Sequence, residues 1–375
     1  MSVFLSSGEA SGDHYTANVA RALREAGYGG RLWGMGGGES RRADMDVLWD
    51  GERLQLLGLA EVVSSIPSIW ALGREIVRQV LRERPDCVVV ADSPDFHMRL
   101  ISWLRHDGYQ GKIFYISPPS VWAWRSGRAD DLRRNVDECL PLFRFEHEYL
   151  LSRGCRSYWK GYPMLEEFSR ENIRRSLPDK LSSDEKLVAI LPGSRRSEIK
   201  YLLPTFEQCA SVLATRGWHP VFSVAPGLNG AVRESMLARF KNSGVDYYEG
   251  PGRELLAAAA CAIGASGTVT VESLLLDRYM VVAYRLNALS ALIGRFVLKT
   301  RRFAMANILA GTDMFPELIQ GAATKENILE YALQWLEGGE EHRAAVVKLM
   351  EDTRRTLGET GVYQAWAGRI MEAAA

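Results

Sequence analysis

The feature that most constrains the fold of this chain is a regular alternation of short apolar runs with longer amphipathic stretches. This pattern is typical of parallel β-sheets that are covered by helices on both faces. We expect strands at residues 3–6, 87–91, 112–116 and 138–142 in the first half, and at residues 187–191, 220–224, 261–264 and 279–284 in the second. Helices are expected between them, in the first half at residues 14–26, 69–84, 96–106 and 146–152. The sequence therefore predicts an α/β protein with two doubly wound, Rossmann-like domains that face a central cleft.

A polar stretch at residues 170–186 interrupts the alternation and predicts a connection between the two domains. We place an N-terminal domain at residues 1–168 and a C-terminal domain at residues 169–340. Residues 341–375 are expected to form helices that can pack back onto the N-terminal domain. The length of 375 residues suits about two to three domains.

The composition excludes several classes of protein. The 46 basic and 46 acidic side chains cancel, which argues against a globally basic nucleic-acid binder. The 47% hydrophobic content argues against disorder. The five cysteines have no metal-ligand or disulfide spacing. We see no signal peptide and no apolar run that is long enough to span a membrane, so we expect a cytoplasmic location.

A loop of small residues at 7–13 joins the first predicted strand to a helix, where backbone amides can approach an anion. Its candidate ligand-binding residues are Gly8, Glu9, Ser11 and Asp13. A tight strand-to-helix turn with Asp13 as the helix N-cap is an equally good explanation. The loop lacks the G-x-G-x-x-G pattern of dinucleotide-binding proteins.

The loop at residues 191–198 follows the first strand of the second half and opens a helix. Ser194 can cap that helix, and Arg195 can place a planar cation against a pyrophosphate. A capping box that runs from Ser194 to Glu198 is the alternative.

The loop at residues 265–272 has the same position after another strand. Gly267 allows close approach of the backbone, and Thr268 offers its amide and its hydroxyl. Glu272 follows one helical turn later, where its carboxylate can accept hydrogen bonds from ribose hydroxyls. Two helix N-termini at one crevice would bind a nucleoside diphosphate without a metal ion.

Six collinear segments of the chain resemble a single family. They are residues 8–13 (Gly-Glu-Ala-Ser-Gly-Asp), 92–96 (Asp-Ser-Pro-Asp-Phe), 120–125 (Ser-Val-Trp-Ala-Trp-Arg), 191–195 (Leu-Pro-Gly-Ser-Arg), 266–268 (Ser-Gly-Thr) with Glu272, and 307–311 (Asn-Ile-Leu-Ala-Gly). The chain is similar along nearly its whole length to the lipid-A-disaccharide synthases, which are inverting, metal-independent glycosyltransferases of the GT-B fold.

The resemblance implies a reaction of lipid A (lipopolysaccharide) biosynthesis. A 2,3-diacylglucosamine unit would pass from its UDP donor to 2,3-diacylglucosamine 1-phosphate, called lipid X. The products would be the β-1,6-linked disaccharide 1-phosphate and UDP, with no metal or other cofactor. Subunits of this family pair through the C-terminal part, so a homodimer is expected.

An inverting transfer needs a base that takes the proton of the acceptor hydroxyl. Asp92 ends a predicted strand and is the first candidate, with Asp95 as the second unless it caps the helix near residue 96. His14 and His97 are alternative bases, because imidazole titrates near neutral pH.

The leaving UDP would be stabilised by Ser194, Arg195 and the helix N-terminus at Thr268. The acceptor side would use residues of the remaining motifs: Gly8, Glu9, Ser11, Asp13, Trp122, Trp124, Arg125 and Asn307. Core packing explains one of the two tryptophans. The chain departs from the family pattern at His97, where relatives usually have Asn, and at Tyr162, where they commonly have His.

Acylated substrates need apolar surface beside cationic groups, and two segments offer it, at residues 62–72 and 288–303. The expected lipid or membrane contacts are Val62, Val63, Ile66, Ile69, Trp70, Leu72, Arg295, Lys299, Arg301 and Arg302. A buried helix with one solvated edge is the alternative explanation. With acylated substrates implied, we expect peripheral binding to the anionic inner-membrane surface.

Two other classes of function remain open. A UDP-sugar epimerase or hydrolase of GT-B type would keep the nucleotide loops and lack the acyl-binding surface. A non-catalytic protein that binds a nucleotide or a lipid would tolerate the loss of Asp92 and Arg195.

Overall fold

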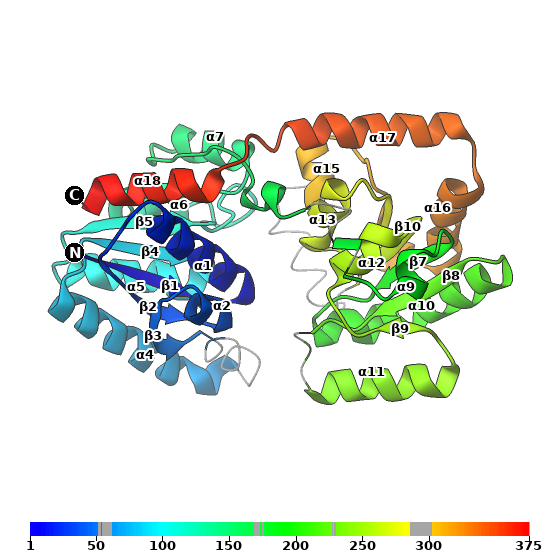
Figure 1. Cartoon of the computed structure of the whole chain (residues 1–375), viewed down its shortest axis with the longest axis horizontal. Helices are drawn as coiled ribbons and strands as arrows, with labels where there is room; N and C mark the ends of the chain where they lie inside the picture. The colour runs from blue at the N-terminus through cyan, green and yellow to red at the C-terminus, as the bar shows by residue number, and fades with distance from the viewer. Residues whose placement is uncertain are drawn as a thin grey trace. The chain divides into compact units, whose positions relative to one another are not determined.

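The computed structural model describes residues 1–51, 54, 62–168, 173–174, 176–226, 228, 230–285 and 302–374, with only the backbone of residues 62–66. The chain divides into two compact units. Unit 1 comprises Met1–Leu165 and Leu357–Ala375, and unit 2 comprises Glu166–Thr356. Each unit contains one six-stranded sheet with helices on both faces, so the predicted α/β class is confirmed (Figure 1).

The sheet of unit 1 is entirely parallel and has the order β3-β2-β1-β4-β5-β6. Its strands are β1 (Ser2–Ser7), β2 (Arg31–Gly36), β3 (Asp46–Asp50), β4 (Cys87–Ala91), β5 (Lys112–Ile116) and β6 (Glu138–Leu140). The order reverses between β1 and β4, and ligands of such sheets bind outside the carboxyl ends of the strands at that point.

Both faces of this sheet are buried, which explains why its strands are continuously apolar. In β1, Val3 and Leu5 pack with α1 (Ala10–Glu25) and α18 (Val362–Ala374). Phe4 points to the opposite face, into the core that contains residues of α4 (Val62–Glu83), α5 (Pro94–His106) and α6 (Arg128–Asn135). Successive side chains of a strand point to opposite faces of the sheet, so the apolar run of β1 contributes to two different cores.

The last helix returns to unit 1 after the chain has built unit 2. Helix α18 packs against α1, and Trp366 is fully buried there. The guanidinium of Arg369 donates hydrogen bonds of 2.7 and 2.6 Å to both carboxylate oxygens of Glu138 in β6. The preceding helix α17 (Glu340–Arg355) stays in unit 2, where Arg354 pairs with Asp277 at 2.7 Å. The chain therefore changes units at residues 356–357, later than the boundary at residue 340 that the sequence suggested.

Because Trp366 fills this core, we expect Trp366→Ala to lower the free energy of unfolding by about 3–5 kcal/mol. Urea titration, followed by circular dichroism and by limited proteolysis of unit 1, measures the loss. Trp366→Phe keeps most of the buried ring and should cost clearly less. Equal midpoints for Trp366→Ala and the unmodified protein would contradict a supporting role for α18.

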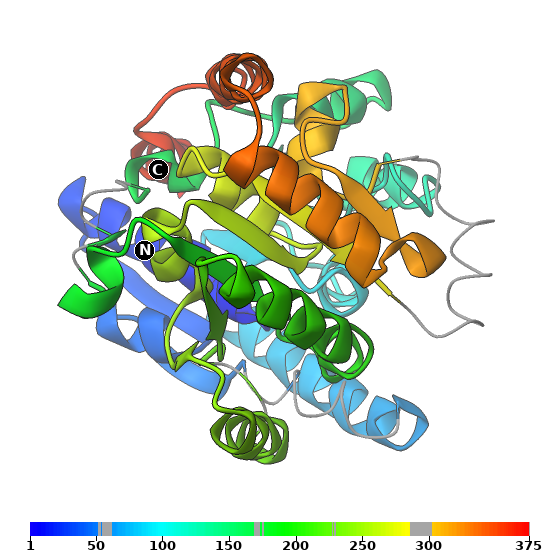
Figure 2. The same cartoon turned by 90° about the vertical axis from the view of Figure 1, so that its right-hand side faces the viewer.

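The sheet of unit 2 repeats the same plan, in the order β12-β11-β10-β7-β8-β9, with all strands parallel. Its strands are β7 (Leu187–Leu191), β8 (His219–Ser223), β9 (Tyr247–Tyr248), β10 (Cys261–Ala265), β11 (Met280–Tyr284) and β12 (Glu317–Ile319). The helices are α9 (Asp179–Ser182), α10 (Arg196–Thr215), α11 (Gly230–Ser243), α12 (Gly252–Ala258), α13 (Val269–Leu275), α15 (Met305–Ala310), α16 (Lys325–Glu337) and α17. Helices α10 and α16 pack side by side on one face (Figure 2).

Candidate active site

A cavity of unit 2 lies at the point where its strand order reverses. The loops after β7 and β10 line a cavity of about 280 Å³. Its wall includes Gly193, Arg195, Gly267, Thr268 and Glu272. Cavities that hold small molecules have a similar or larger volume, from about 300 Å³. The structure therefore brings together the predicted donor residues of both loops.

The β7 loop depends on one glycine and one buried carboxylate. Gly193 has φ of +99°, and a Cβ atom there would lie 2.2 Å from Oε2 of Glu198. The same Oε2 accepts hydrogen bonds of 3.3 Å from the backbone N–H groups of Ser194 and Arg195. Helix α10 begins at Arg196 with Arg195 at the N-cap position, so the prediction that Ser194 caps it is wrong. The predicted capping contact between Glu198 and Ser194 is present through the Ser194 amide.

Arg195 is the cation that this loop offers to a ligand. One of its nitrogens lies 3.1 Å from Oε1 of Glu198, while 74% of its side chain is exposed. The guanidinium can therefore turn toward an anion and still remain beside Glu198. Water reaches the Arg195 side of this ion pair and screens it, so the pair holds the guanidinium only weakly.

The β10 loop contributes a carboxyl group and an unobstructed backbone. Nothing lies within 4 Å of a Cβ atom built on Gly267, and Thr268 occupies the N-cap position of α13. Burial raises the pKa of Glu272, and the nearby Arg253 lowers it in part. A carboxyl group in this place can hydrogen-bond to neighbouring hydroxyls of a sugar.

In unit 1, Asp92 follows β4 directly and is held by two hydroxyl groups. Ser11 donates a hydrogen bond of 2.6 Å to Oδ2, and Ser117 donates one of 2.7 Å to Oδ1. Burial raises the pKa of Asp92, and these two hydrogen bonds lower it in part. The sequence did not single out Ser117 as a site residue, although Ser117 directly follows β5 just as Asp92 follows β4. The arrangement suits a carboxylate base.

Asp95 has a different environment. Its side chain is 74% exposed and pairs with Arg125 at 3.3 Å and with Arg128. Helix α5 begins at Pro94 with Ser93 at the N-cap position, so Asp95 does not cap it. Arg125 also lies 4.4 Å from the ring of Trp124, which gives this end of unit 1 two cations beside an aromatic ring. Such a surface can hold a phosphate group.

Trp122 is the tryptophan of the pair that serves packing. Its indole N–H donates a hydrogen bond of 3.0 Å to Glu146, and its ring meets Phe145 edge-on. Burial raises the pKa of Glu146 to about 7.

Tyr162 is the other departure from the family pattern. It is buried, and its ring stacks on that of Phe143 with 5.1 Å between the ring centres.

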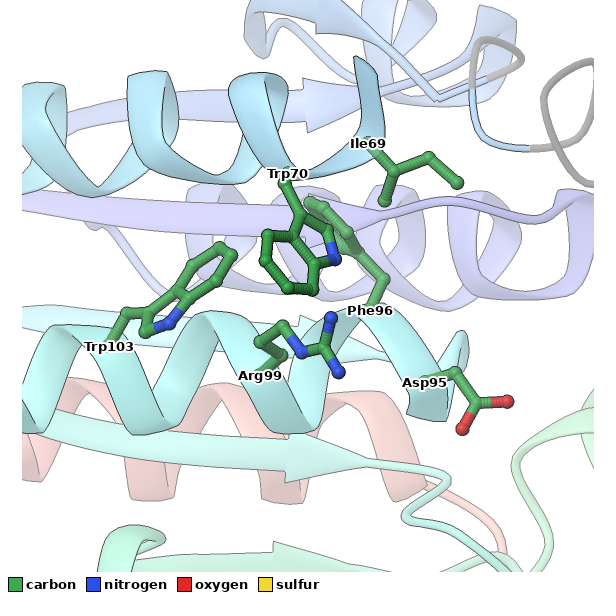
Figure 3. Close-up of a pocket in the computed structure, with 6 residues that line it drawn as sticks. All are labelled: Ile69, Trp70, Asp95, Phe96, Arg99 and Trp103. Carbon is green, nitrogen blue, oxygen red and sulfur yellow. The ribbon is translucent and has the colours of Figure 1, made fainter. Parts of the chain in front are cut away.

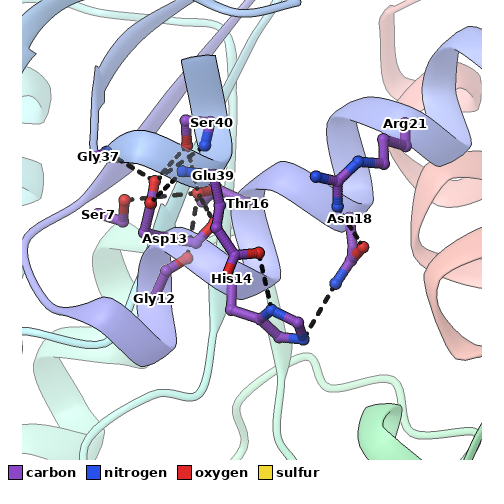
Figure 4. Close-up of polar contacts among 10 residues, drawn as sticks. All are labelled: Ser7, Gly12, Asp13, His14, Thr16, Asn18, Arg21, Gly37, Glu39 and Ser40. Atoms are coloured by element: carbon purple, nitrogen blue, oxygen red, sulfur yellow. Dashed lines mark hydrogen bonds and ion pairs between the residues drawn. The ribbon is translucent and has the colours of Figure 1, made fainter. Parts of the chain in front are cut away.

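Asp13 holds two helices together. Its carboxylate accepts hydrogen bonds from the backbone N–H groups of Gly37, Glu39 and Ser40, and from the hydroxyl of Ser40 (Figure 4). These groups open α2 (Gly38–Arg42), so Asp13 caps a helix remote in sequence. The predicted N-cap of α1 is corrected, because α1 already begins at Ala10. Only 8% of Asp13 is exposed, which argues against its predicted contact with the acceptor.

The other residues of this loop lie closer to Asp92. Ser11 and Glu9 are exposed, and Ser11 contacts Asp92 as described above. Gly8 is closely packed, because a Cβ atom there would lie 2.5 Å from Cδ1 of Leu54 and 2.7 Å from Oγ of Ser93. The loop and Asp92 thus share the carboxyl edge of the sheet beside its reversal point.

The two alternative bases have different surroundings. Nδ1 of His14 lies 2.9 Å from Glu39, and its Nε2 lies 3.1 Å from the side-chain amide of Asn18 (Figure 4). His97 is fully buried, and burial lowers its pKa to about 4. A neutral, enclosed imidazole cannot reach a substrate, so His97 is excluded as the base.

Asn307 is also part of a core. Its side chain is fully buried in unit 2 and accepts a hydrogen bond of 2.8 Å from Phe315 N–H. Its amide group donates to the Phe315 carbonyl at 2.7 Å and to Glu317 at 2.8 Å. Because these bonds occupy the amide, the predicted acceptor contact of Asn307 is not supported.

An aromatic and cationic surface lies on α4 and α5 of unit 1. Trp70 is 47% exposed, its ring lies 4.7 Å from the guanidinium of Arg99, and it meets Trp103 edge-on. Together with Ile69, Asp95 and Phe96, these residues line a small pocket of about 20 Å³ (Figure 3). The sequence singled out Ile69 and Trp70 of this group but overlooked Arg99 on the neighbouring helix.

The remaining predicted lipid contacts divide into three groups. Leu72 is 6% exposed and packs into the core, because helical periodicity turns it toward the sheet, so its predicted lipid contact is wrong. Arg302 is paired with Asp313 at 2.8 Å. The others lie outside the described residues: the side chains of Val62, Val63 and Ile66, and the whole of Arg295, Lys299 and Arg301.

The described residues contain neither a membrane-spanning helix nor a cluster of metal ligands. No helix there is both long and apolar enough to cross a lipid bilayer. In the same part of the chain, no cluster of three or more His, Cys, Asp or Glu side chains is arranged as a metal site.

Two doubly wound, parallel sheets of the same strand order, one in each unit, give the protein the GT-B fold. A UDP-GlcNAc 2-epimerase from Neisseria meningitidis, bound to UDP-GlcNAc, has the same fold with a TM-score of 0.67 and 12% identity, over 99% of this chain and 100% of that one. A trehalose-6-phosphate synthase structure has a TM-score of 0.58 and 10% identity, over 100% of this chain and 98% of that one. At these identities the likeness concerns the fold alone.

A family model described as Lipid-A-disaccharide synthetase matches residues 3–367. The lipid-A-disaccharide synthase of Myxococcus xanthus is 32% identical, over 99% of this chain and 97% of the relative. That of Alcanivorax borkumensis is 34% identical, over 99% and 98%. The chain therefore belongs to the lipid-A-disaccharide synthase family, and the resemblance that its six motifs predicted is confirmed. The epimerase alternative is not favoured.

Proposed function

We propose that this glycosyltransferase moves a 2,3-diacylglucosamine unit from UDP to the 6-hydroxyl of 2,3-diacylglucosamine 1-phosphate. The observation that carries the proposal is the cavity of unit 2, where Arg195, Gly267 and Glu272 meet, in a chain of this family. The diphosphate would lie against Arg195 and the backbone amides of the two loops. Glu272 would accept hydrogen bonds from the ribose.

In the proposed reaction, Asp92 takes the proton of the acceptor hydroxyl. The hydroxyl oxygen then bonds to C1 of the donor sugar as the bond between C1 and the UDP oxygen breaks, which inverts the configuration at C1. The electron pair of the broken bond leaves on UDP, and Arg195 stabilises that negative charge. Ser11 and Ser117 each occupy one oxygen of Asp92, and each oxygen keeps a lone pair for the acceptor.

UDP release in the presence of both substrates tests the function. We expect UDP to form only when UDP-diacylglucosamine and lipid X are supplied together, and the disaccharide to form in equal amount. UDP release from the donor alone would indicate a hydrolase. Interconversion of the donor with its C2 epimer would indicate an epimerase.

We also propose that no metal ion takes part, because Arg195 and backbone amides supply the positive charge that the leaving diphosphate needs. The rate of UDP release should be the same after dialysis against excess EDTA and after Mg²⁺ is added back. A loss of activity in EDTA that Mg²⁺ restores would contradict the proposal.

We further propose that the surface of Trp70, Arg99 and Trp103 contacts anionic lipid, consistent with a peripheral position at the cytoplasmic face of the inner membrane. Aromatic rings and arginines suit the interface between acyl chains and headgroups. In flotation assays, the protein should bind vesicles that contain phosphatidylglycerol, and Trp70→Ser should weaken this binding. Tyr331→Ser, at an exposed aromatic residue of unit 2, is the matched control. Equal flotation of the two variants would oppose this assignment.

The pairing of two subunits through the C-terminal part of the chain remains a prediction.

A further inference from the structure

The backbone at the candidate base has an unusual conformation. Asp92 and Ser93 have φ of 53° and 45°, so the two residues that follow β4 are both left-handed, and neither is glycine. This region of conformational space is unfavourable for L-residues and is kept only where surrounding contacts impose it. The direction of the Asp92 carboxylate therefore depends on the groups that hold this turn.

Two side chains hold the turn through one atom, the carbonyl oxygen of Asp92. Nδ1 of His97 lies 2.8 Å from this oxygen, and the hydroxyl of Tyr115 donates a hydrogen bond of 3.0 Å to it. His97 belongs to the first turns of α5, and Tyr115 belongs to β5. Both side chains are fully buried. They thus fix the peptide that carries the candidate base from two different elements.

The surroundings define the tautomer of His97. A carbonyl oxygen can only accept, so Nδ1 must carry the hydrogen. Nε2 lies 2.9 Å from Oγ of Ser6, which is fully buried in β1. In the neutral imidazole Nε2 then accepts the hydrogen of the Ser6 hydroxyl. His97 therefore joins the ends of β1 and β4, the two strands at the reversal point of the sheet, by directional hydrogen bonds.

We propose that His97 is a positioning residue that holds the left-handed turn at Asp92, and so directs the Asp92 carboxylate between Ser11 and Ser117. The proposal rests on the proposed role of Asp92 as the base. His97 acts on the reaction only through Asp92 and takes up no proton itself. Its loss misdirects the carboxylate and leaves both substrate sites unchanged.

Two substitutions separate hydrogen bonding from packing. In His97→Asn, the side-chain amide nitrogen lies where Nδ1 was and can donate to the Asp92 carbonyl, although it does not reach Ser6. His97→Leu fills the space without a donor. We expect His97→Leu to lower kcat about 10²-fold, the effect of a misplacement of about 1 Å, with little change in KM for either substrate. His97→Asn should restore most of kcat.

A double-mutant cycle with Asp92→Asn shows whether His97 acts through Asp92. On the Asp92→Asn background, His97→Leu should change the residual kcat less than about 3-fold, because there is no base left to direct. If His97→Leu lowers kcat equally on both backgrounds, the positioning role fails and the base assignment stands. If Asp92→Asn alone is fully active, the base assignment fails whatever His97 does.

If His97→Leu does not fold, a second substitution tests the same proposal. Tyr115→Phe removes the other hydrogen bond to the same carbonyl and keeps the ring. It should lower kcat in the same direction, again without a change in KM and without an effect on the Asp92→Asn background. Folded His97→Leu or Tyr115→Phe protein with unchanged kcat would overturn the proposal.

Discussion

Replacing Asp92 with Asn is expected to lower kcat by about 10²–10⁴-fold, the usual contribution of a general base. Asparagine fills the same space and can still interact with Ser11 and Ser117, but it cannot take a proton from the acceptor hydroxyl. UDP binding should be unchanged, because the residues that we propose to bind the donor lie in unit 2. Initial rates of UDP release and calorimetric titration with UDP measure the two quantities.

Asp95→Asn is the matched control for this substitution. Its carboxylate is exposed and paired with two arginines, so we expect a change in kcat of less than about 10-fold, as for an exposed ion pair. A larger loss of kcat for Asp95→Asn than for Asp92→Asn would exchange the roles of the two carboxylates. Full turnover by Asp92→Asn would remove Asp92 from the mechanism.

The pH profile gives an independent test of the same residue. Burial raises the pKa of Asp92, and only the ionised carboxylate can act as a base. The value of kcat/KM should therefore fall as the pH drops through this pKa, at a higher pH than for an ordinary aspartate. Glu146, whose pKa is raised to about 7, is the nearby group that could produce a similar acid limb. Glu146→Gln should leave the limb in place if Asp92 causes it.

The second large effect concerns the leaving group. Arg195→Ala should lower kcat by about 10²–10³-fold, in the range found when one preorganised donor to a developing negative charge is removed. Arg195→Lys keeps the charge but loses the planar pair of donors, so its kcat should lie between that of Arg195→Ala and that of the unmodified protein. Single-turnover rates at saturating donor measure the chemical step, and calorimetry measures the affinity for UDP.

Arg196→Ala is the control for Arg195, because Arg196 is the adjacent exposed arginine of α10. It should retain nearly the full rate. If Arg195→Ala weakened UDP binding and left the saturated rate unchanged, Arg195 would contribute to ground-state binding alone. Arg195 would then have no special role in the departure of UDP.

Much of the fold could be predicted because buried parallel strands have an unmistakable composition. Strands β4, β5 and β7 begin and end where the apolar runs at 87–91, 112–116 and 187–191 do. Strands β2, β3, β9 and β12 were not predicted. Glycines interrupt β2, aspartates flank β3, and the last two contain only two and three residues. These strands form because they pair with neighbouring strands of the sheet, and a local sequence pattern does not reveal such pairing.

The candidate site could be predicted as far as strand ends define it. Asp92, Arg195 and Glu272 lie where the rule for parallel sheets places ligand-binding residues. Asp13 and Asn307 were assigned to ligands, yet each is bound by a segment of its own unit. A polar side chain in a loop does not reveal whether its partner is a substrate or a distant backbone amide. That distinction needs the tertiary structure.

The return of α18 to unit 1 has a consequence for the order of synthesis. Unit 2 is contiguous in the chain and can fold while the ribosome is still working, whereas unit 1 waits for residues 357–375. At about 5–20 residues per second, the roughly 190 residues between its two parts delay completion by about 10–40 s. During that time α1 lacks its apolar cover from α18. Loss of residues 357–375 would therefore damage the unit that carries Asp92, although every residue of unit 2 would have been made.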